Sequence, residues 1–358
     1  MAPDAPVAAV TGIGMRAANG EHAVQVAASV RAAVNRFREW PHLVLTEGPL
    51  VASFVDPDLL DRSWVDKVFQ LLAPTVVEAI VDSGLVDSGI LGALGRAGRL
   101  RMFVNAPRRD RAGTEAAAIA ALPDQLSRGL LPDGVAAPVD VFFQGRVGGV
   151  AALLKAVEAI ATDQADVCLV AGVDSLLHGP SLRALMADDR VKTPNLPSGL
   201  IPGEGAGCLV LESRAAARRR RTAVKAGVGF AALAQEAAGW KPDSPVRADG
   251  LVRAMCSASE CGVRSSRVLL DLNGERWRFL EWTVAEARLA DLLPAGWRPW
   301  HPADCWGDVG AAFAPMAVAL GARAFARRFA GGGSILVAAS GDRGERGAFV
   351  LLPPEAFG

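Results

Sequence analysis

The stretch VDVFFQGRVGGVAALLKAVEAIATDQADVCLVAGV (Val139–Val173) decides the fold class of this chain. It begins with VDVFF, which predicts a short strand, and the glycine-rich turn QGRVGG follows. Apolar residues then recur at helical spacing from Val150 to Ile160, which predicts a helix with one face in the core. VCLVAGV is apolar throughout, as in a strand buried on both faces. Strand, glycine turn, helix and strand in this order are typical of an α/β fold.

Ahead of this stretch, the pattern predicts a strand, a polar connection, helices and a second strand. VAAVTGIGM (7–15) is an apolar run that ends in glycines, which predicts a buried strand and a turn. A polar stretch with several prolines follows to about Pro74. The pattern from Val76 to about Leu94 predicts helices, and LRMFVN (100–105) predicts another buried strand.

The C-terminal part repeats the same order of elements. VLLDL (268–272) predicts a strand, NGER a turn, and a helix follows to about Leu293. WGDVGAA opens a helix that we expect to run to about Ala330, where three glycines end it. SILVAAS and AFVLL predict two closing strands. We interpret the repeated order as an internal duplication, with an N-terminal half at 1–225 and a C-terminal half at 226–358.

Composition excludes several classes of protein. The 358 residues carry 38 Lys and Arg against 38 Asp and Glu, and this zero net charge argues against a nucleic-acid partner. No run reaches the roughly 20 apolar residues of a membrane span, and the N-terminus lacks the basic start of a signal peptide. The cysteines show no CxxC pair, so we expect a cytoplasmic protein with no zinc site, no other metal and no cofactor. They are Cys168, Cys208, Cys256, Cys261 and Cys305.

A specific signal is the glycine-rich loop PGEGAG, which leads into a strand at a set distance after AGVDS. With VTGIGM near the N-terminus and ADVCLVAGVDS, the segment GVDSLLHGPSLRALMADDRVKTPNLPSGLIPGEGAGCLVLE (Gly172–Glu212) resembles the β-ketoacyl synthases, the condensing enzymes of fatty-acid and polyketide assembly. This resemblance covers most of the chain. It implies a thiolase-like fold of two related halves in five layers, αβαβα. Members are usually dimers through a strand of the N-terminal half, so a dimer is expected by analogy.

The resemblance also implies a catalytic set of one cysteine and two histidines. In the family, the cysteine lies at the N-terminus of a buried helix, whose dipole and N–H groups favour the thiolate and the later oxyanion. The histidines assist decarboxylation of the malonyl unit. Counting back from ADVCLVAG, with the helix-start glycine matched to Gly149, places Arg146 at the cysteine position. The histidine positions hold Asn273, in LLDLNGER, and Asp308, in WGDVGAA. We therefore expect no ordinary condensing reaction.

The rest of the remnant pocket differs from the family pattern as well. SGDRGERG replaces the family's glycine- and phenylalanine-rich gate, with Asp342 near the gating position and Arg343 beside it. RVGGVAAL also resembles the chain-length factors, non-acylating partners of an active synthase in which glutamine replaces the nucleophile. Gln144 lies two residues from Arg146, so a shifted alignment would place a glutamine at that position.

An arginine at the N-terminus of a buried helix is electrostatically unfavourable, because that helix end already carries partial positive charge. An unpaired buried charge is strongly destabilising. We therefore expect an acidic partner for Arg146 among Asp308, Asp342 and Glu275, or an anionic ligand. Three interpretations stay open: a charged network that closes the former acyl site, a pocket that drifted after function was lost, and a new site for a polar ligand.

Some other residues have both a structural and a chemical interpretation. Cys305 lies close to the second histidine loop and is a candidate relocated nucleophile, although a buried free cysteine is usually inert. His301 is a surface histidine or a titrating group. The run Arg218–Arg221 is a solvated helix face or a phosphate-docking patch for a carrier. Three tryptophans form part of the core or a ligand box, and these are Trp297, Trp300 and Trp306.

We interpret the chain as a catalytically inactive β-ketoacyl synthase homologue that acts as a scaffold or partner in an acyl-carrier-dependent biosynthetic system. The expected partners are a second copy of the chain or an active ketosynthase, together with an acyl carrier protein. One alternative is an acyltransferase or condensing-type enzyme with altered chemistry in fatty-acid or polyketide metabolism. The other is a sensor of a small anionic ligand held by Arg146.

Overall fold

A computed structural model describes residues 7–45, 48–59, 62–86, 89–237, 239–240, 245–260 and 264–357. Within these ranges the main sheet has ten strands in the order β10-β9-β11-β12-β8-β1-β7-β6-β4-β5. The strands of its N-terminal side are β1 (Val7–Ala17), β4 (Leu100–Asn105), β5 (Val139–Phe142), β6 (Val167–Ser175) and β7 (Glu204–Glu212). Those of its C-terminal side are β8 (Ala226–Gln235), β9 (Ser265–Leu270), β10 (Arg298–Trp300), β11 (Ser334–Ser340) and β12 (Glu345–Leu352).

The strand order repeats on either side of the pair β1 and β8. Outward from β1 the strands are β7, β6, β4 and β5, and outward from β8 they are β12, β11, β9 and β10. On both sides the first two pairings are antiparallel and the outer two are parallel. A duplicated unit would give this matched arrangement. The boundary that we propose between residues 225 and 226 lies immediately before β8.

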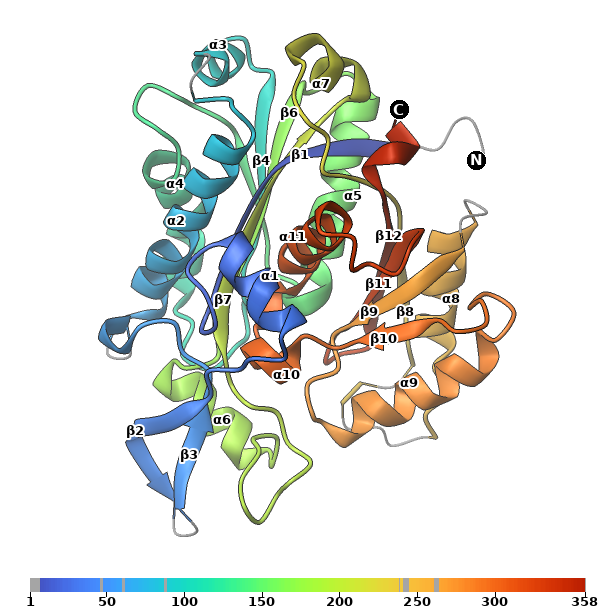
Figure 1. The fold of residues 1–358 in the computed structure, drawn as a ribbon. Helices are drawn as coiled ribbons and strands as arrows, with labels where there is room; N and C mark the ends of the chain where they lie inside the picture. Colours follow the sequence, from blue (N-terminus) through green and yellow to red (C-terminus); the bar gives the residue numbers. More distant parts are fainter. Residues whose placement is uncertain are drawn as a thin grey trace.

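Helices form three layers around the two sides of the sheet (Figure 1). The outer face of the N-terminal side packs against α2 (Trp64–Asp82), α3 (Ile90–Arg96) and α4 (Ala116–Gly129). The central layer holds α5 (Gly148–Ala161) and α11 (Phe313–Ala326). The outer face of the C-terminal side packs against α8 (Asp249–Ser259) and α9 (Arg276–Arg288). The layers alternate as αβαβα, which confirms the α/β, thiolase-like fold expected from the sequence.

Shorter elements connect these layers. The helices among them are α1 (Ala23–Arg31), α6 (Gly179–Ala187), α7 (Arg214–Arg220) and α10 (Ala303–Trp306). A separate hairpin consists of β2 (Arg38–Leu45) and β3 (Gly48–Ala52). The short 3-10 turns are η1 (Pro57–Leu59), η2 (Gly145–Val147), η3 (Gly310–Ala312) and η4 (Pro354–Phe357). Of these, η2 and η3 lead directly into the two central helices, so both central helices begin with a tightened turn.

Small residues bring the beginnings of the two central helices into contact. A Cβ atom on Gly149 would lie 2.7 Å from the Cβ atom of Ala314, which is closer than real Cβ atoms approach, and 3.2 Å from Cδ of Pro315. Asn105, at the end of β4, donates through Nδ2 to the carbonyl oxygens of Gly145 (2.6 Å) and Ala311 (2.8 Å). This amide fastens η2 to η3, so residues next to the two turns face one another.

The prediction of a polar connection as far as Pro74 is wrong. The region contains α1, the β2–β3 hairpin and the first half of α2, and Pro74 lies inside α2. A proline inside a helix leaves the carbonyl four residues earlier without its N–H partner. Here the Gln70 carbonyl accepts a hydrogen bond from Nη1 of Arg16 at 3.2 Å. This contact from β1 compensates for the proline, and no local sequence pattern could indicate it.

Other boundaries differ by a few residues, and several elements were not predicted. The helices predicted over 76–94 are the second part of α2 and most of α3. α9 ends at Arg288 and α11 at Ala326, each a few residues before the predicted end. The strands β8 and β10 and the helices α4, α6, α8 and α10 had not been assigned from the sequence. No helix in the described part of the chain is long and apolar enough to cross a membrane.

Candidate functional site

Arg146 lies in η2, immediately ahead of α5, at the place expected for it. Its side chain is 10% exposed and forms an ion pair with the Asp308 carboxylate, which is fully buried. Asp308 also accepts hydrogen bonds from Nδ2 of Asn273 (2.7 Å) and from the backbone N–H of Gly310 (2.9 Å). Asn273 Nδ2 reaches Glu275 as well, at 3.0 Å. Of the three acidic residues considered as partners for Arg146, Asp308 is therefore the one that pairs with it.

The other acidic residues belong to an adjoining set of ion pairs. Arg190 donates Nε and Nη2 to the two carboxylate oxygens of Glu275, at 2.6 and 3.1 Å. It also donates Nη1 and Nη2 to Asp342, at 2.9 and 3.1 Å. Arg278 donates to Glu275 (3.2 Å), to Asp342 (3.1 Å) and to Asp271 (2.8 Å). We call the connected set the inner network, and its members are Arg146, Arg190, Asp271, Asn273, Glu275, Arg278, Asp308 and Asp342.

Burial and ion pairing act in opposite directions on the carboxylates of the inner network. Burial alone would raise the pKa of Asp308, but attraction to Arg146 and the hydrogen bond from it hold that pKa below its ordinary value. Burial is likewise outweighed by neighbouring guanidiniums at Asp342 and Glu275, whose pKa values are lowered. Burial alone would lower the pKa of Arg146, but attraction to Asp308 outweighs burial and holds that pKa above its ordinary value. All four groups are therefore charged at neutral pH.

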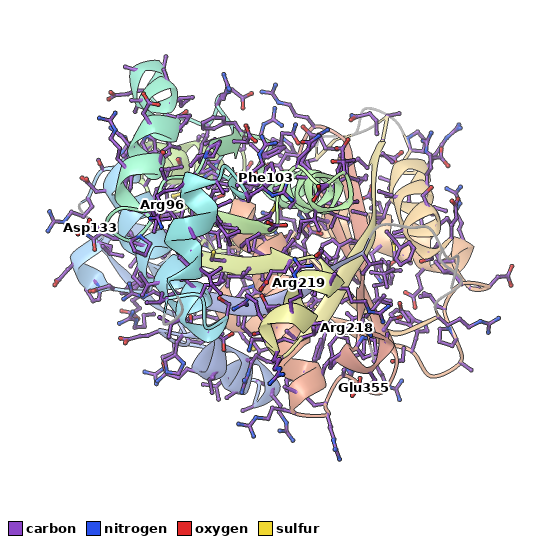
Figure 2. All side chains as sticks on the ribbon, turned by 90° about the horizontal axis from the view of Figure 1, so that it is seen from above. Arg96, Phe103, Asp133, Arg218, Arg219 and Glu355 are labelled. Carbon is purple, nitrogen blue, oxygen red and sulfur yellow. The ribbon has the colours of Figure 1, made fainter. Side chains whose placement is uncertain are left out.

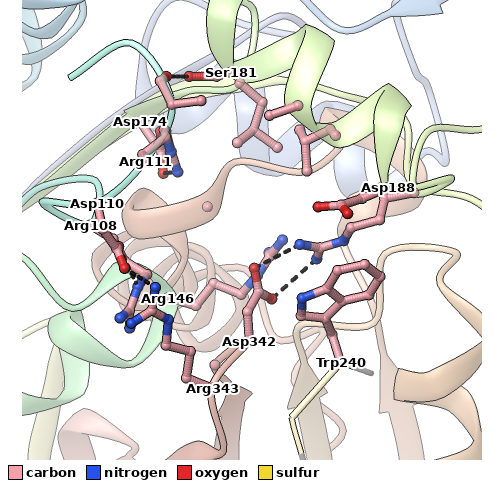
Figure 3. Close-up of a pocket in the computed structure, with 18 of the residues that line it drawn as sticks. Arg108, Asp110, Arg111, Arg146, Asp174, Ser181, Asp188, Trp240, Asp342 and Arg343 are labelled. Carbon is pink, nitrogen blue, oxygen red and sulfur yellow. Dashed lines mark hydrogen bonds and ion pairs between the residues drawn. The ribbon is translucent and has the colours of Figure 1, made fainter. Parts of the chain in front are cut away.

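A hollow of about 250 Å³ lies above this network and is the mouth of the site (Figure 3). The loop 341–344 between β11 and β12 lies on one side of it. In this loop Arg343 forms an ion pair with Asp110, and Arg108 pairs with both Asp110 (3.1 Å) and Glu345. Figure 3 shows Arg343 and Asp110 meeting on the side of the hollow opposite Trp240. The loop is therefore tied to the segment after β4 by charged contacts.

Three predicted residues of the remnant pocket lie outside the inner network. Gln144 is exposed and lines the mouth, directly before η2. Gly149 forms the close contact between the central helices described above. Arg343 is mostly exposed, with 65% of its side-chain surface accessible, and lines the mouth as well.

Beneath Arg146 the structure is almost filled. The cavity there measures about 10 Å³, close to the least volume that holds one water molecule. It is bounded by Asn273, Asp308, Trp306 and Phe313, among others. Sites for small organic ligands usually enclose roughly 300–1,000 Å³. The residues that the structure describes on this side of Arg146 therefore leave no room for an acyl chain.

The cysteines that the structure describes are placed as packing residues or at the surface, and none lines either cavity. Burial raises the pKa of the Cys168 and Cys208 thiols to about 12. Cys305 is 5% exposed, and burial raises its pKa as well, which disfavours the thiolate. Cys256 is exposed, and Cys261 lies outside the described residues.

The remaining candidate groups contribute little to the site. His301 forms an ion pair with Asp304 at 2.6 Å, and the hydrogen bond that its Nδ1 donates to this carboxylate raises the pKa of His301. Arg220 pairs with the buried Glu212 at 2.7 Å, while Arg218, Arg219 and Arg221 are exposed. The tryptophans pack with other aromatic rings or in the core: Trp297 against Trp282, Trp300 against Phe329, and Trp306 buried at 1% exposure. No group of three or more metal-binding side chains occurs among the described residues.

Sequence reasoning missed the two arginines that hold the acidic residues of the inner network. Arg190 follows α6 and Arg278 lies in the first turn of α9, and both are less than 8% exposed. The pairing of Arg278 with Glu275 three residues earlier was detectable as a local ion pair on a helix. The pairing of Arg190 with Glu275 joins residues 85 positions apart, so only the fold brings them together.

Comparison with known proteins gives one family match, over a segment that begins just after Arg146. Residues 148–217 match the family model of the β-ketoacyl synthase N-terminal domain. A search of curated proteins finds no match. Solved structures similar to the chain include the ishigamide ketosynthase/chain length factor, at 18% identity and a TM-score of 0.76, with 98% of this chain and 99% of that chain covered.

Two further structures are similar over nearly the whole chain. The AntDE:AntF complex, a type II polyketide-synthase acyl-carrier protein with its ketosynthase, has a TM-score of 0.76 at 16% identity, with 98% of this chain and 100% of that chain covered. The module 6 ketosynthase of the bacillaene synthase from Bacillus subtilis 168 has a TM-score of 0.75 at 14% identity, covering 97% of this chain and 72% of that chain. At these identities the likeness establishes a ketosynthase fold.

Proposed function

We propose that this chain, which carries the β-ketoacyl synthase signature at residues 148–217 and the ketosynthase fold, is an inactive synthase homologue that serves as a partner in acyl-carrier-dependent biosynthesis. The observation that carries the proposal is the ion pair of Arg146 with the buried Asp308 at the N-terminus of α5. In an active synthase this helix end holds the cysteine that takes the acyl chain. A cytoplasmic location fits this role.

The chemistry of the three replaced positions supports inactivity. Under our alignment Arg146 replaces the cysteine, and Asn273 and Asp308 replace the two histidines. A guanidinium cannot form a thioester, and here it is held charged by Asp308. An amide and an ionised carboxylate offer no imidazole N–H to stabilise an enolate. Decarboxylation would instead place a developing negative charge beside the Asp308 carboxylate, which is electrostatically unfavourable.

A partner role is supported by the kind of structures that this chain resembles. One is a ketosynthase and chain length factor, and another is a ketosynthase with its acyl-carrier protein. β5 (Val139–Phe142) is at the end of the described sheet order, where its outer edge is open to pairing with another strand. We propose that this edge joins the chain to an active ketosynthase or to a second copy of itself, and that an acyl carrier protein visits the assembly.

A sensor of a small anion is the weaker alternative, although five arginines line the mouth of the site. They are accompanied there by four aspartates. Arg108, Arg111 and Arg343 each form an ion pair with a carboxylate. An incoming anion would have to compete with these carboxylates, whereas the inert, partner-binding interpretation needs no ligand. Altered acyl-transfer chemistry is also weaker, because the small cavity beneath Arg146 has no space for an acyl group.

Incubation with malonyl-carrier and acyl-carrier substrates tests the lost activity. We expect no release of carbon dioxide and no added mass on the intact protein, with an active ketosynthase as the positive control. Carbon dioxide release, or an acyl adduct on any residue, would contradict inactivity.

Size-exclusion chromatography with an intact ketosynthase from the same source tests the partner role separately. We expect a heterodimer, and a variant with proline at Val141 should prevent it, because proline removes an N–H from the edge strand. The matched control is Val141→Thr, which keeps the backbone donor. A chain that associates only with itself and binds no carrier would overturn the partner role and leave inactivity standing.

A further inference from the structure

A groove of about 490 Å³ lies between α1 and the C-terminal end of α11, away from the site described above. α11 begins beside Arg146 and extends for 14 residues, so its far end lies about 20 Å from that site at 1.5 Å per residue. Figure 1 shows α1 crossing in front of α11. The groove is therefore a separate feature of the surface, which the ketosynthase-like site does not use.

The floor and one wall of the groove are apolar. Ala23, Val26 and Ala27 are the buried face of α1 and fix this helix on the core. Val24 and Ala28 lie on its outward side, and Val24 is 45% exposed. A buried anchor beneath an exposed apolar strip gives a rigid surface that is available to a partner.

Three arginines surround this apolar strip. Arg31 ends α1, and Arg323 and Arg327 lie at the end of α11, four residues apart on one helix face. The Arg31 guanidinium lies 5.2 Å from the ring centre of Phe329, which forms the end of the groove. Of the described residues that line the groove, none carries a carboxyl group. This contrasts with the mouth of the ketosynthase-like site, where arginines and aspartates are mixed.

The ends of the two helices do not account for all of this positive charge. Arg31 and Arg323 lie in the last turns of α1 and α11, where a helix end carries about half a negative charge. Two such ends offset about one of the three guanidinium charges. A local surplus of about two positive charges remains, on a chain whose formal net charge is zero.

We propose that this groove docks an acidic amphipathic helix of a partner protein. An amphipathic helix recognised in a groove places its apolar side chains on the floor and its charged side chains along the walls. Val24, Ala28 and Phe329 would contact the apolar face of such a helix. Carboxylates flanking that face would pair with Arg31, Arg323 and Arg327. The proposal does not depend on whether the ketosynthase-like site is inactive.

Binding of a synthetic probe tests the docking site. The probe is a short, fluorescently labelled helical peptide with leucines on one face and glutamates beside them, compared with a scrambled peptide of the same composition. We expect binding to the whole protein that weakens as salt rises and falls at least about tenfold for the scrambled peptide. Binding of both peptides with equal affinity, or of neither, would overturn the proposal.

Charge reversal locates the binding. R323E/R327E should weaken binding of the acidic peptide by about tenfold or more. The matched control R96E/R219E makes the same change of charge at exposed arginines of α3 and α7, on another part of the surface (Figure 2), and should leave binding within about twofold. Equal losses in both variants would show a general charge effect and refute the groove. Anionic lipid vesicles give a further comparison. If the protein bound these vesicles more strongly than the peptide, and R323E/R327E abolished that binding, the groove would be a membrane-binding surface and the proposal would be refuted.

A polar substitution tests the apolar floor without altering charge. V24S removes an exposed branched apolar side chain of the groove and should weaken binding of the acidic peptide by about threefold to tenfold. Circular dichroism and the melting temperature Tm report whether each variant remains folded. Peptide binding to the groove does not involve Arg146. Absence of peptide binding would therefore leave the proposed inactivity unaffected, and detection of acyl chemistry would leave the proposed groove unaffected.

Discussion

Replacing Arg146 by alanine should destabilise the protein strongly. The substitution removes the ion-pair partner of Asp308, a carboxylate with no exposed side-chain surface. Breaking a buried pair by removing one partner usually costs about 3–5 kcal/mol. Asp308 keeps its hydrogen bonds from Asn273 and from the Gly310 N–H, so we expect a loss at the low end, about 3 kcal/mol.

The expected change in melting temperature follows from the size of the chain. Unfolding entropy of about 2.1 cal/mol/K per residue gives roughly 0.75 kcal/mol/K for this chain. A loss of about 3 kcal/mol would then lower the Tm by about 4 °C, and calorimetry or tryptophan fluorescence can measure this shift. Arg343→Ala is the matched control, because that side chain is 65% exposed and its ion pair with Asp110 lies at the surface. We expect the control to change stability by less than about 1 kcal/mol.

The dependence of the R146A effect on pH separates a buried charge from lost packing. Burial is already the largest single influence on the pKa of Asp308, and Arg146 contributes most to offsetting it. Without Arg146, the pKa of Asp308 should therefore rise above the ordinary value. The deficit in stability should then be greatest at neutral pH and shrink as the solution becomes acidic and Asp308 is protonated. A deficit below about 1 kcal/mol, or one that does not change with pH, would refute the reasoning.

The remaining predictions concern acid stability and thiol reactivity. The folded-state pKa values of Asp308 and Asp342 lie below their unfolded values, so their contribution is complete above about pH 4 and is lost as the pH falls further. The Tm should therefore fall steeply in acid, and the substitution Asp308→Asn should flatten this part of the profile; an unchanged profile would contradict the assignment. In the native protein, alkylation followed by peptide mass spectrometry should leave Cys168, Cys208 and Cys305 unmodified, because burial raises their pKa values. Rapid modification of Cys305 would instead revive it as a candidate nucleophile.

The sequence indicated the fold well where strands were wholly apolar and helices amphipathic. The stretch Val139–Val173 gave β5, α5 and β6 in the expected order. The prediction was wrong where tertiary contacts override a local signal. Pro74 argued against a helix, yet Arg16 from β1 satisfies the carbonyl that the proline leaves free. The β8 strand was missed, although its pairing with β1 joins the two sides of the sheet.

The candidate site was predictable in kind but not in detail. The position of Arg146 at the beginning of a buried helix, and its need for a carboxylate, followed from the sequence and from helix electrostatics. The sequence did not show whether Asp308 or Asp342 would pair with Arg146, because the loops that carry these two residues converge on the same region. Arg190 could not have been expected, since its two carboxylate partners come from distant loops. Such long-range pairing leaves no periodic or local signal in the sequence.

The geometry around Asp308 explains why a cysteine at position 146 would not by itself be a good nucleophile. Asp308 accepts a hydrogen bond from the N–H of Gly310 at the start of η3 and forms an ion pair with Arg146 directly before α5. One carboxylate therefore contacts the beginnings of both central helices. A cysteine at position 146 would gain the positive end of the α5 dipole, which favours a thiolate. It would also face the Asp308 carboxylate, which would have lost its ion-pair partner, and this like charge disfavours the thiolate. Since Asn273 donates to Asp308 and Glu275 together, these positions act as one electrostatic unit. A change at position 146 alone would therefore not make a reactive thiolate, because Asn273 and Asp308 would still set the charge around it.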